Sequence, residues 1–242
     1  MGYRLMAGQG KRFRGFRDMV QVGHAYSVEE AVGLAKETGR AGFDSTVELH
    51  LNLGIDPAHQ DQQVRGTVAL PHGTGKTVRV IAFASGDSAA GAKAAGADEV
   101  GAEDLAQKVQ SGWLDFDATV ATPDMMRIVS PLGRILGPRG LMPNARAGTV
   151  TSDLAQAVQA IKAGQVEYRA DQGGNIHFAI GKVSFSEEQL LANLLAALDA
   201  IIRARPDGAK GTYINSVTLS TTMGPGILVD LNEAVNMART VA

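Results

Sequence analysis

A chain of 242 residues, of which 45% are hydrophobic and 20% charged, is long enough to bury one large core or two smaller ones as a soluble globular protein. The absence of cysteine excludes disulfides, thiolate nucleophiles and cysteine-based metal sites. The longest apolar stretch, residues 190–202, is too short to span a bilayer, and no signal-peptide pattern follows the basic N-terminus. We therefore expect a cytoplasmic protein with no membrane partner.

Charge is distributed unevenly, although the formal net value of −2 is less basic than is usual for nucleic-acid-binding domains. Residues 1–17 hold five basic side chains and no acidic one, and residues 127–146 hold four arginines and no acidic residue. Residues 98–124, in contrast, hold seven carboxylates and a single lysine. This distribution predicts two positive patches, and a solvated face remains the alternative interpretation of each.

The first half of the chain changes from an antiparallel to a parallel pattern. Ser27 and Glu30 form a capping-box pattern that predicts a helix ending near Thr38. Residues 43–51 alternate between apolar and polar side chains, as half-buried antiparallel strands do, whereas residues 78–84 are almost continuously apolar, as parallel strands buried on both faces are. Alternating short helices and strands are then expected near residues 88–95, 99–101, 103–111 and 118–121.

The second half returns to an antiparallel α+β pattern. The turn residues 171–174 separate two strand-like runs and predict a hairpin between them. The elements expected here are a helix over 153–163, the hairpin of 166–169 and 175–180, a helix capped by Ser186 and ending near Arg205, and a strand over 214–221.

These patterns predict an α/β protein of two domains. Both chain ends, residues 1–74 and 164–242, are expected to form a discontinuous α+β domain, with residues 75–163 inserted as a Rossmann-like parallel α/β domain. Glycine permits large backbone rotations, so hinge residues are expected where the chain crosses between the domains, at Gly73, Gly75 and Gly164.

Two patterns that would indicate an enzyme are incomplete. Residues 70–77 resemble a phosphate-binding P-loop, but Leu70 stands at the first glycine position and a strand, not a helix, is expected after Thr77. Ala90 stands where a nucleophile elbow requires glycine, so Ser88 is interpreted as a helix N-cap. A nucleotide-binding enzyme with a P-loop-like site remains the alternative function.

The sequence gives no stronger support for metal binding or acid–base catalysis. The five histidines are scattered and none forms a helical pair beside a glutamate, so they are interpreted as surface or capping residues. Asp115 and Asp117 stand at a spacing that is common where a loop enters a strand, and we assign them no catalysis. No cofactor, metal or catalytic residue is expected.

Nine longer motifs, taken together and in order, are similar to those of one known family. They are GKR at 10–12, FDSTVE at 43–48, LGIDP at 53–57, VRGTV at 64–68, LPHG at 70–73, ATPD at 121–124, GRILGPRGLMPN at 133–144, GAKGT at 208–212 and TTMGP at 221–225. With these motifs the chain resembles bacterial large-subunit ribosomal protein one, the mobile-stalk family, over residues 7–228.

The resemblance implies a function and partners. Members of that family grip a stalk of large-subunit ribosomal RNA with a split first domain, and their inserted Rossmann-like domain binds no dinucleotide. The family also contacts the elbow of exit-site transfer RNA and assists its release, and in bacteria it represses translation of its own messenger RNA. We expect these roles here, with the free protein a monomer.

The same motifs imply an RNA site. An aromatic ring, hydroxyl groups and a carboxylate suit RNA, which offers 2′-hydroxyls, base edges and sugar faces, while basic side chains neutralise phosphates. The expected ribosomal-RNA-binding residues are Lys11, Arg12, Arg14, Phe43, Thr46, Glu48, Lys210, Thr221, Thr222, Met223 and Gly224. A core Phe43 and a simple turn at Gly224 remain the alternative.

The chain also departs from the family pattern. Gly42 and Gln172 stand where many relatives have lysine, which puts some phosphate contacts in doubt. Residues 1–5 and 232–242 extend beyond the usual ends, and Met6 is an alternative initiator. The arginine-rich loop around Arg134 and Arg139 has two interpretations, a surface that faces RNA or a brace between the two domains.

Overall fold

The computed structural model describes residues 10–241; Arg4 and the alternative initiator Met6 lie outside the described residues. The chain divides into two compact units. The first takes in the described residues up to Val64, Leu70–Gly75 and the chain from Tyr168 onward, and the second consists of Arg65–Ala69 and Lys76–Glu167. Whether the predicted segments 1–74 with 164–242 and 75–163 fold independently stays a prediction.

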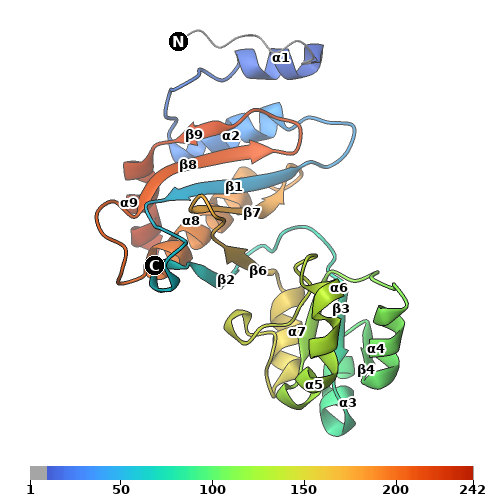
Figure 1. Ribbon diagram of the computed structural model, residues 1–242. Helices are drawn as coiled ribbons and strands as arrows, with labels where there is room; N and C mark the ends of the chain where they lie inside the picture. The colour runs from blue at the N-terminus through green and yellow to red at the C-terminus, as the bar shows by residue number, and fades with distance from the viewer. Residues whose placement is uncertain (1–9, 242) are drawn as a thin grey trace. The chain divides into compact units, whose positions relative to one another are not determined.

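A four-stranded antiparallel sheet forms the centre of the first unit (Figure 1). The strand order is β7-β1-β8-β9, with bounds Asn175–Lys182, Thr46–Leu53, Ile214–Thr221 and Ile227–Val229. Along β1 every second side chain is buried, which confirms the predicted alternation of a half-buried strand. The sheet therefore has an apolar face inside the unit and a polar face outside it.

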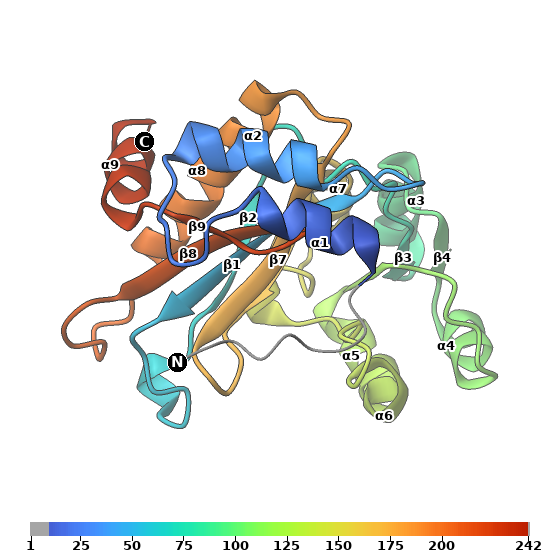
Figure 2. The same ribbon diagram turned by 90° about the horizontal axis from the view of Figure 1, so that it is seen from above.

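Three helices pack on this sheet, α2 (Val28–Thr38), α8 (Glu187–Arg203) and α9 (Leu231–Val241) (Figure 2). Capping boxes at Ser27 and Ser186 begin α2 and α8, as predicted. In each, the serine hydroxyl accepts the backbone N–H of the third helical residue, and the side chain of that residue accepts the serine N–H. The shorter α1 (Lys11–Asp18) buries no residue.

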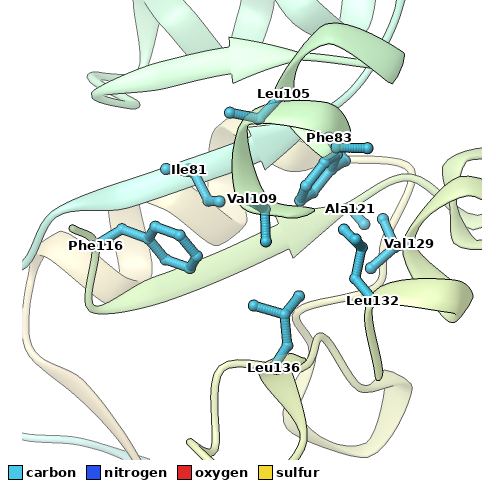
Figure 3. Packing of buried hydrophobic residues seen from close by; sticks show 10 residues of the cluster. Ile81, Phe83, Leu105, Val109, Phe116, Ala121, Val129, Leu132 and Leu136 are labelled. Atoms are coloured by element: carbon cyan, nitrogen blue, oxygen red, sulfur yellow. The ribbon is translucent and has the colours of Figure 1, made fainter. Parts of the chain in front are cut away.

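The second unit holds a parallel sheet of order β4-β3-β5, with bounds Glu99–Gly101, Val80–Phe83 and Ala118–Ala121. Every residue of β3 is buried, as the continuous apolar run predicts. The strand sends Ile81 and Phe83 into one apolar cluster and Val80 and Ala82 into another. Figure 3 shows the first of these clusters, in which Phe83 lies near Leu132 and Val129.

Helices cover both faces of the parallel sheet. Helix α7 and the Ala92 side of α3 complete one cluster, and α4, α5 and α6 complete the other. The remaining bounds are α3 Gly86–Ala94, α4 Glu103–Gln110, α5 Met126–Val129, α6 Gly133–Leu136, α7 Leu154–Lys162, and single 3-10 turns at Gln60–Gln62, Pro123–Met125, Ser130–Leu132 and Ala145–Ala147. The expected α/β class, with parallel and antiparallel sheets, is confirmed.

Two predictions about local structure are wrong. The runs on either side of residues 171–174 form no hairpin, because β6 (Gln165–Arg169) pairs with β2 (Arg65–Ala69) whereas β7 pairs with β1. The turn is present, but the chain changes sheets there. Ser88 lies inside α3 rather than at its start, since Ser85 is the N-cap residue.

No helix in the described part of the chain combines the length and the apolar character needed to cross a membrane.

Candidate nucleic-acid interface

The segments before β1 and after β8 lie side by side at one edge of the antiparallel sheet. Val47 pairs with Thr221 in register, which brings Thr222 next to Thr46. The Thr46 N–H donates to the Thr222 hydroxyl (3.0 Å), and the Thr222 N–H donates to the Thr46 carbonyl (3.2 Å). Two predicted site motifs that are far apart in the sequence are thus joined by hydrogen bonds.

Two large apolar side chains are exposed at this edge. Phe43 is 54% exposed and Met223 is 52% exposed, so Phe43 is not the core residue of the alternative interpretation. The Asp44 carboxylate anchors the Phe43 segment by accepting hydrogen bonds from the Ser184 N–H (3.0 Å) and hydroxyl (2.8 Å). The segment is therefore held in place while the ring faces solvent.

Polar side chains continue from this edge along the outer face of the sheet. Thr46 and Glu48 are half-exposed, and Glu48 lies opposite Ser220 of β8. Lys182, directly opposite Thr46 on β7, donates from Nζ to the Thr46 hydroxyl (2.8 Å). Sequence reasoning missed Lys182, because its place beside Thr46 depends on strand register and not on any local motif.

Glycine is required at position 224. A Cβ there would overlap the Thr221 hydroxyl oxygen and lie 3.3 Å from the Thr38 carbonyl oxygen. The Thr221 side chain is 4% exposed, and its hydroxyl has no hydrogen-bond partner among the described residues. Thr221 therefore faces inward beneath the loop, whereas Thr222 and Met223 face solvent.

Two of the five histidines form a pair, contrary to the expectation of scattered residues. The Nδ1 atoms of His50 and His177 are 2.7 Å apart across β1 and β7, and His50 Nε2 is 2.7 Å from the Ser220 hydroxyl. Burial lowers the pKa of His50, the nearby His177 lowers it further, and Glu48 opposes both effects. Residues 10–241 contain no cluster of three or more potential metal ligands of the His, Cys, Asp and Glu types.

Helix α1 carries the predicted basic residues Lys11, Arg12 and Arg14 on its exposed surface. Beside it lies a cavity of about 270 Å³, lined by the helix, by residues 20–23 and by Pro225, Gly226 and Leu228. Since residues 225–228 continue directly from Met223 and Gly224, the basic helix borders the same loop.

Lys210 is not brought to this edge. It precedes β8, whereas Thr222 follows it, and a strand of eight residues separates the two ends by roughly 25 Å at about 3.3 Å per residue. The interpretation of Lys210 as a further phosphate contact must therefore involve a different part of the RNA.

All three expected hinge glycines have positive φ angles, 64° at Gly73, 71° at Gly75 and 105° at Gly164, a region that glycine enters without steric strain. The fully buried Asn193 of α8 fixes the segment around Gly73. Its amide accepts from the His72 N–H (3.0 Å) and donates to the Gly73 carbonyl (2.8 Å).

The P-loop interpretation fails in the structure. The chain after Thr77 forms no helix and enters β3 at Val80, so no helix N-terminus is present there to receive a phosphate. Lys76 instead pairs with Asp117 at 2.6 Å, which holds the pKa of Asp117 below its usual value. Arg79 does the same for Asp115, so both carboxylates are held in the ionised form.

Comparison with known proteins identifies the family. The model of the ribosomal protein L1p/L10e family matches residues 34–225. Among similar proteins, the large ribosomal subunit protein uL1 of Thermobifida fusca (strain YX) is 56% identical over 231 residues, which cover 96% of this chain and 98% of that relative. These matches confirm the resemblance inferred from the motifs. The chain therefore belongs to the ribosomal protein L1p/L10e family.

Proposed function

We propose that the protein is a structural component of the large ribosomal subunit, in the cytoplasm, and that its first unit binds the ribosomal RNA of the mobile stalk. The observation that carries the proposal is the hydrogen-bonded union of the Thr46 and Thr222 segments, which presents Phe43 and Met223 to solvent beside Glu48. Membership in the ribosomal family supports the same partner.

Each side chain of this edge suits a different feature of RNA. The exposed ring of Phe43 offers a stacking platform for an unpaired base, and Met223 offers an apolar contact for a sugar. The Glu48 carboxylate is an acceptor for a 2′-hydroxyl or a base amine. We propose that Lys182 and the basic residues of α1 neutralise phosphates, and such contacts position the RNA without specifying its sequence.

The hydroxyl of Thr222 also makes a hydrogen bond within the protein, because it accepts the Thr46 N–H. Thr221 and Gly224 shape the loop from beneath, and we propose that they act on RNA only through the backbone they position.

The wider roles are part of the same proposal. We infer that the protein also contacts exit-site transfer RNA and assists its release, and that it represses its own messenger RNA by binding a copy of the stalk site. The free protein is proposed to be a monomer in which a Rossmann-like unit turns about Gly73, Gly75 and Gly164.

Phe43→Ala tests the RNA site directly. Because the Phe43 ring is exposed to solvent, its removal should weaken binding to a stalk fragment of ribosomal RNA by about 1–3 kcal/mol, the usual value of one stacked base. Binding is measured by titration with labelled RNA, and thermal unfolding should be unchanged.

Phe43→Leu is the matched control, since it keeps an apolar side chain and removes only the aromatic face. It should bind almost as weakly as Phe43→Ala if the ring stacks on a base. Wild-type affinity in both variants would contradict the proposed site. Tight binding of ATP or GTP by the wild-type protein, without binding of the stalk fragment, would instead favour the enzyme alternative.

A further inference from the structure

The second unit presents an unpaired arginine surface, defined here as Arg127, Arg134 and Arg139. From Met125 to Gly137 the backbone stays right-handed and helical through α5, the 3-10 turn Ser130–Leu132 and α6. An α-helix turns by about 100° per residue, so Arg127 and Arg134, seven residues apart, project from the same side.

The opposite side of this helical segment is anchored in the core. Val129, Leu132 and Leu136 have no exposed surface, and Figure 3 shows them within the apolar cluster that contains Phe83. The arginine side chains face solvent because these three residues fix the rotation of the segment. Arg139 follows in an exposed turn whose Gly140 has a φ of 69° and open space around its Cα.

Among the described residues of the unit these arginines, like Lys93, have no carboxylate partner, whereas Arg65, Lys76, Arg79, Lys108 and Lys162 each have one. Five carboxylates of the unit are held in the pairs Arg65–Glu167, Lys76–Asp117, Arg79–Asp115, Lys108–Glu99 and Lys162–Asp98. Within residues 10–241 no ion pair or hydrogen bond engages the side chain of Arg127, Arg134 or Arg139. No acidic residue lies between positions 125 and 152 to supply one.

We propose that the arginine surface is a second RNA-binding surface, which takes the phosphate backbone of structured RNA while the first unit holds the stalk. A guanidinium group stays charged and donates two parallel hydrogen bonds to a phosphate, and the glycine-rich turn lets a sugar–phosphate chain approach closely. This inference rests on the proposed function and deepens it, because it assigns residues to the contact with transfer RNA.

The test uses the full chain bound to a stalk fragment of ribosomal RNA, titrated with labelled transfer RNA. Arg127→Gln/Arg134→Gln should weaken transfer RNA binding by about tenfold or more and reduce the magnitude of the salt slope by up to about two. Affinity for the stalk fragment should be unchanged. Arg127→Lys/Arg134→Lys should lose an intermediate amount, because a lysine keeps the charge but not the paired donors.

Lys93→Gln/Arg239→Gln is the matched control, since it removes two exposed positive charges from α3 and α9. It should leave transfer RNA binding nearly unchanged. Equal binding by Arg127→Gln/Arg134→Gln and wild type, or no binding of transfer RNA by the wild-type complex, overturns the inference. Loss of stalk binding in the arginine variant overturns it too, since the surface would then belong to the first site. Failure of the wild-type protein to bind the stalk fragment defeats the proposed function itself.

Discussion

A single buried amide, that of Asn193, fixes the path of the segment that leaves the first unit. Besides the two bonds to His72 and Gly73, its Nδ2 atom donates to the Ile180 carbonyl at 2.7 Å. Because glycine leaves the backbone free to rotate, these hydrogen bonds hold the His72–Gly73 part of the segment against α8 and leave Gly75 outside the contact.

Asn193→Leu should therefore destabilise the protein. The substitution leaves three backbone groups without a partner at a buried position, and we expect the free energy of unfolding in urea to fall by about 2–4 kcal/mol. Asn236→Leu, at an exposed position of α9, is the control and should change stability little. Equal stability of the two variants would contradict the role given to Asn193.

The histidine pair predicts a dependence of stability on pH. The pKa of folded His50 lies below its usual value of 6.5, so the unfolded chain takes up this proton first as the pH falls. The folded state should lose stability from about pH 6.5 downward, until the lower pKa of the folded state is passed. His177, Glu48 and the Ser220 hydroxyl are the groups that surround the ring.

His50→Gln should remove this contribution. Urea unfolding measured between about pH 7.5 and pH 5 should give a steeper loss of stability in the wild-type protein than in the variant, since only the wild type carries the ring that resists protonation. Carboxylates that do not contact His50 contribute equally to both curves, so the difference between the curves reports on His50 together with its neighbours Glu48 and His177. Parallel curves would show that the ring titrates alike in the folded and unfolded chains.

At the scale of elements, the sequence predicts those helices and strands that local interactions specify. The capping boxes at Ser27 and Ser186 and the uninterrupted apolar run of β3 specify their elements without help from the rest of the chain. Strand pairing is not local, and for this reason the sequence wrongly predicts a hairpin of β6 and β7. Turn residues bend the chain but do not choose its partner strand.

The candidate site, too, is predictable from the sequence only where a local motif defines it. Its motifs were recognised one by one, whereas the contacts that join them arise from the register of β1 with both β7 and β8. Lys182 and the His50–His177 pair belong to this register and leave no signal in the sequence. Lys210, chosen from its motif alone, lies at the opposite end of β8.

The loop after β8 offers a test of how elements shape the site. Gly224→Ala should force the new methyl group against the buried Thr221 hydroxyl, which displaces the loop and lowers stability by about 1–3 kcal/mol. Thr221→Ala removes that hydroxyl and should restore much of the loss in the double variant. Unfolding and stalk binding of all four proteins form the cycle, and additive effects would mean that the two residues do not touch.

At the scale of the molecule, each unit builds its central sheet and its apolar core from its own residues. The central strand β1 of the first unit comes from the first third of the chain and pairs with β7 and β8 from the last third, so this unit needs both ends of the chain. Both apolar clusters of the second unit draw only on residues between Val78 and Ile161. The chain passes between the units at four places, before and after Arg65–Ala69, after Gly75 and after Glu167.

A chain that joins residues 1–75 to 163–242 through a short glycine–serine linker should fold without the insert. It retains the whole antiparallel sheet, its three helices, the Asn193 amide and every residue proposed to bind the stalk. We expect cooperative unfolding in urea and an affinity for the stalk fragment close to that of the full chain. Phe43→Ala in the shortened chain should weaken this binding as it does in the full chain, which excludes nonspecific attraction. Loss of both folding and specific binding would mean that the units depend on each other and that the split-domain interpretation is wrong.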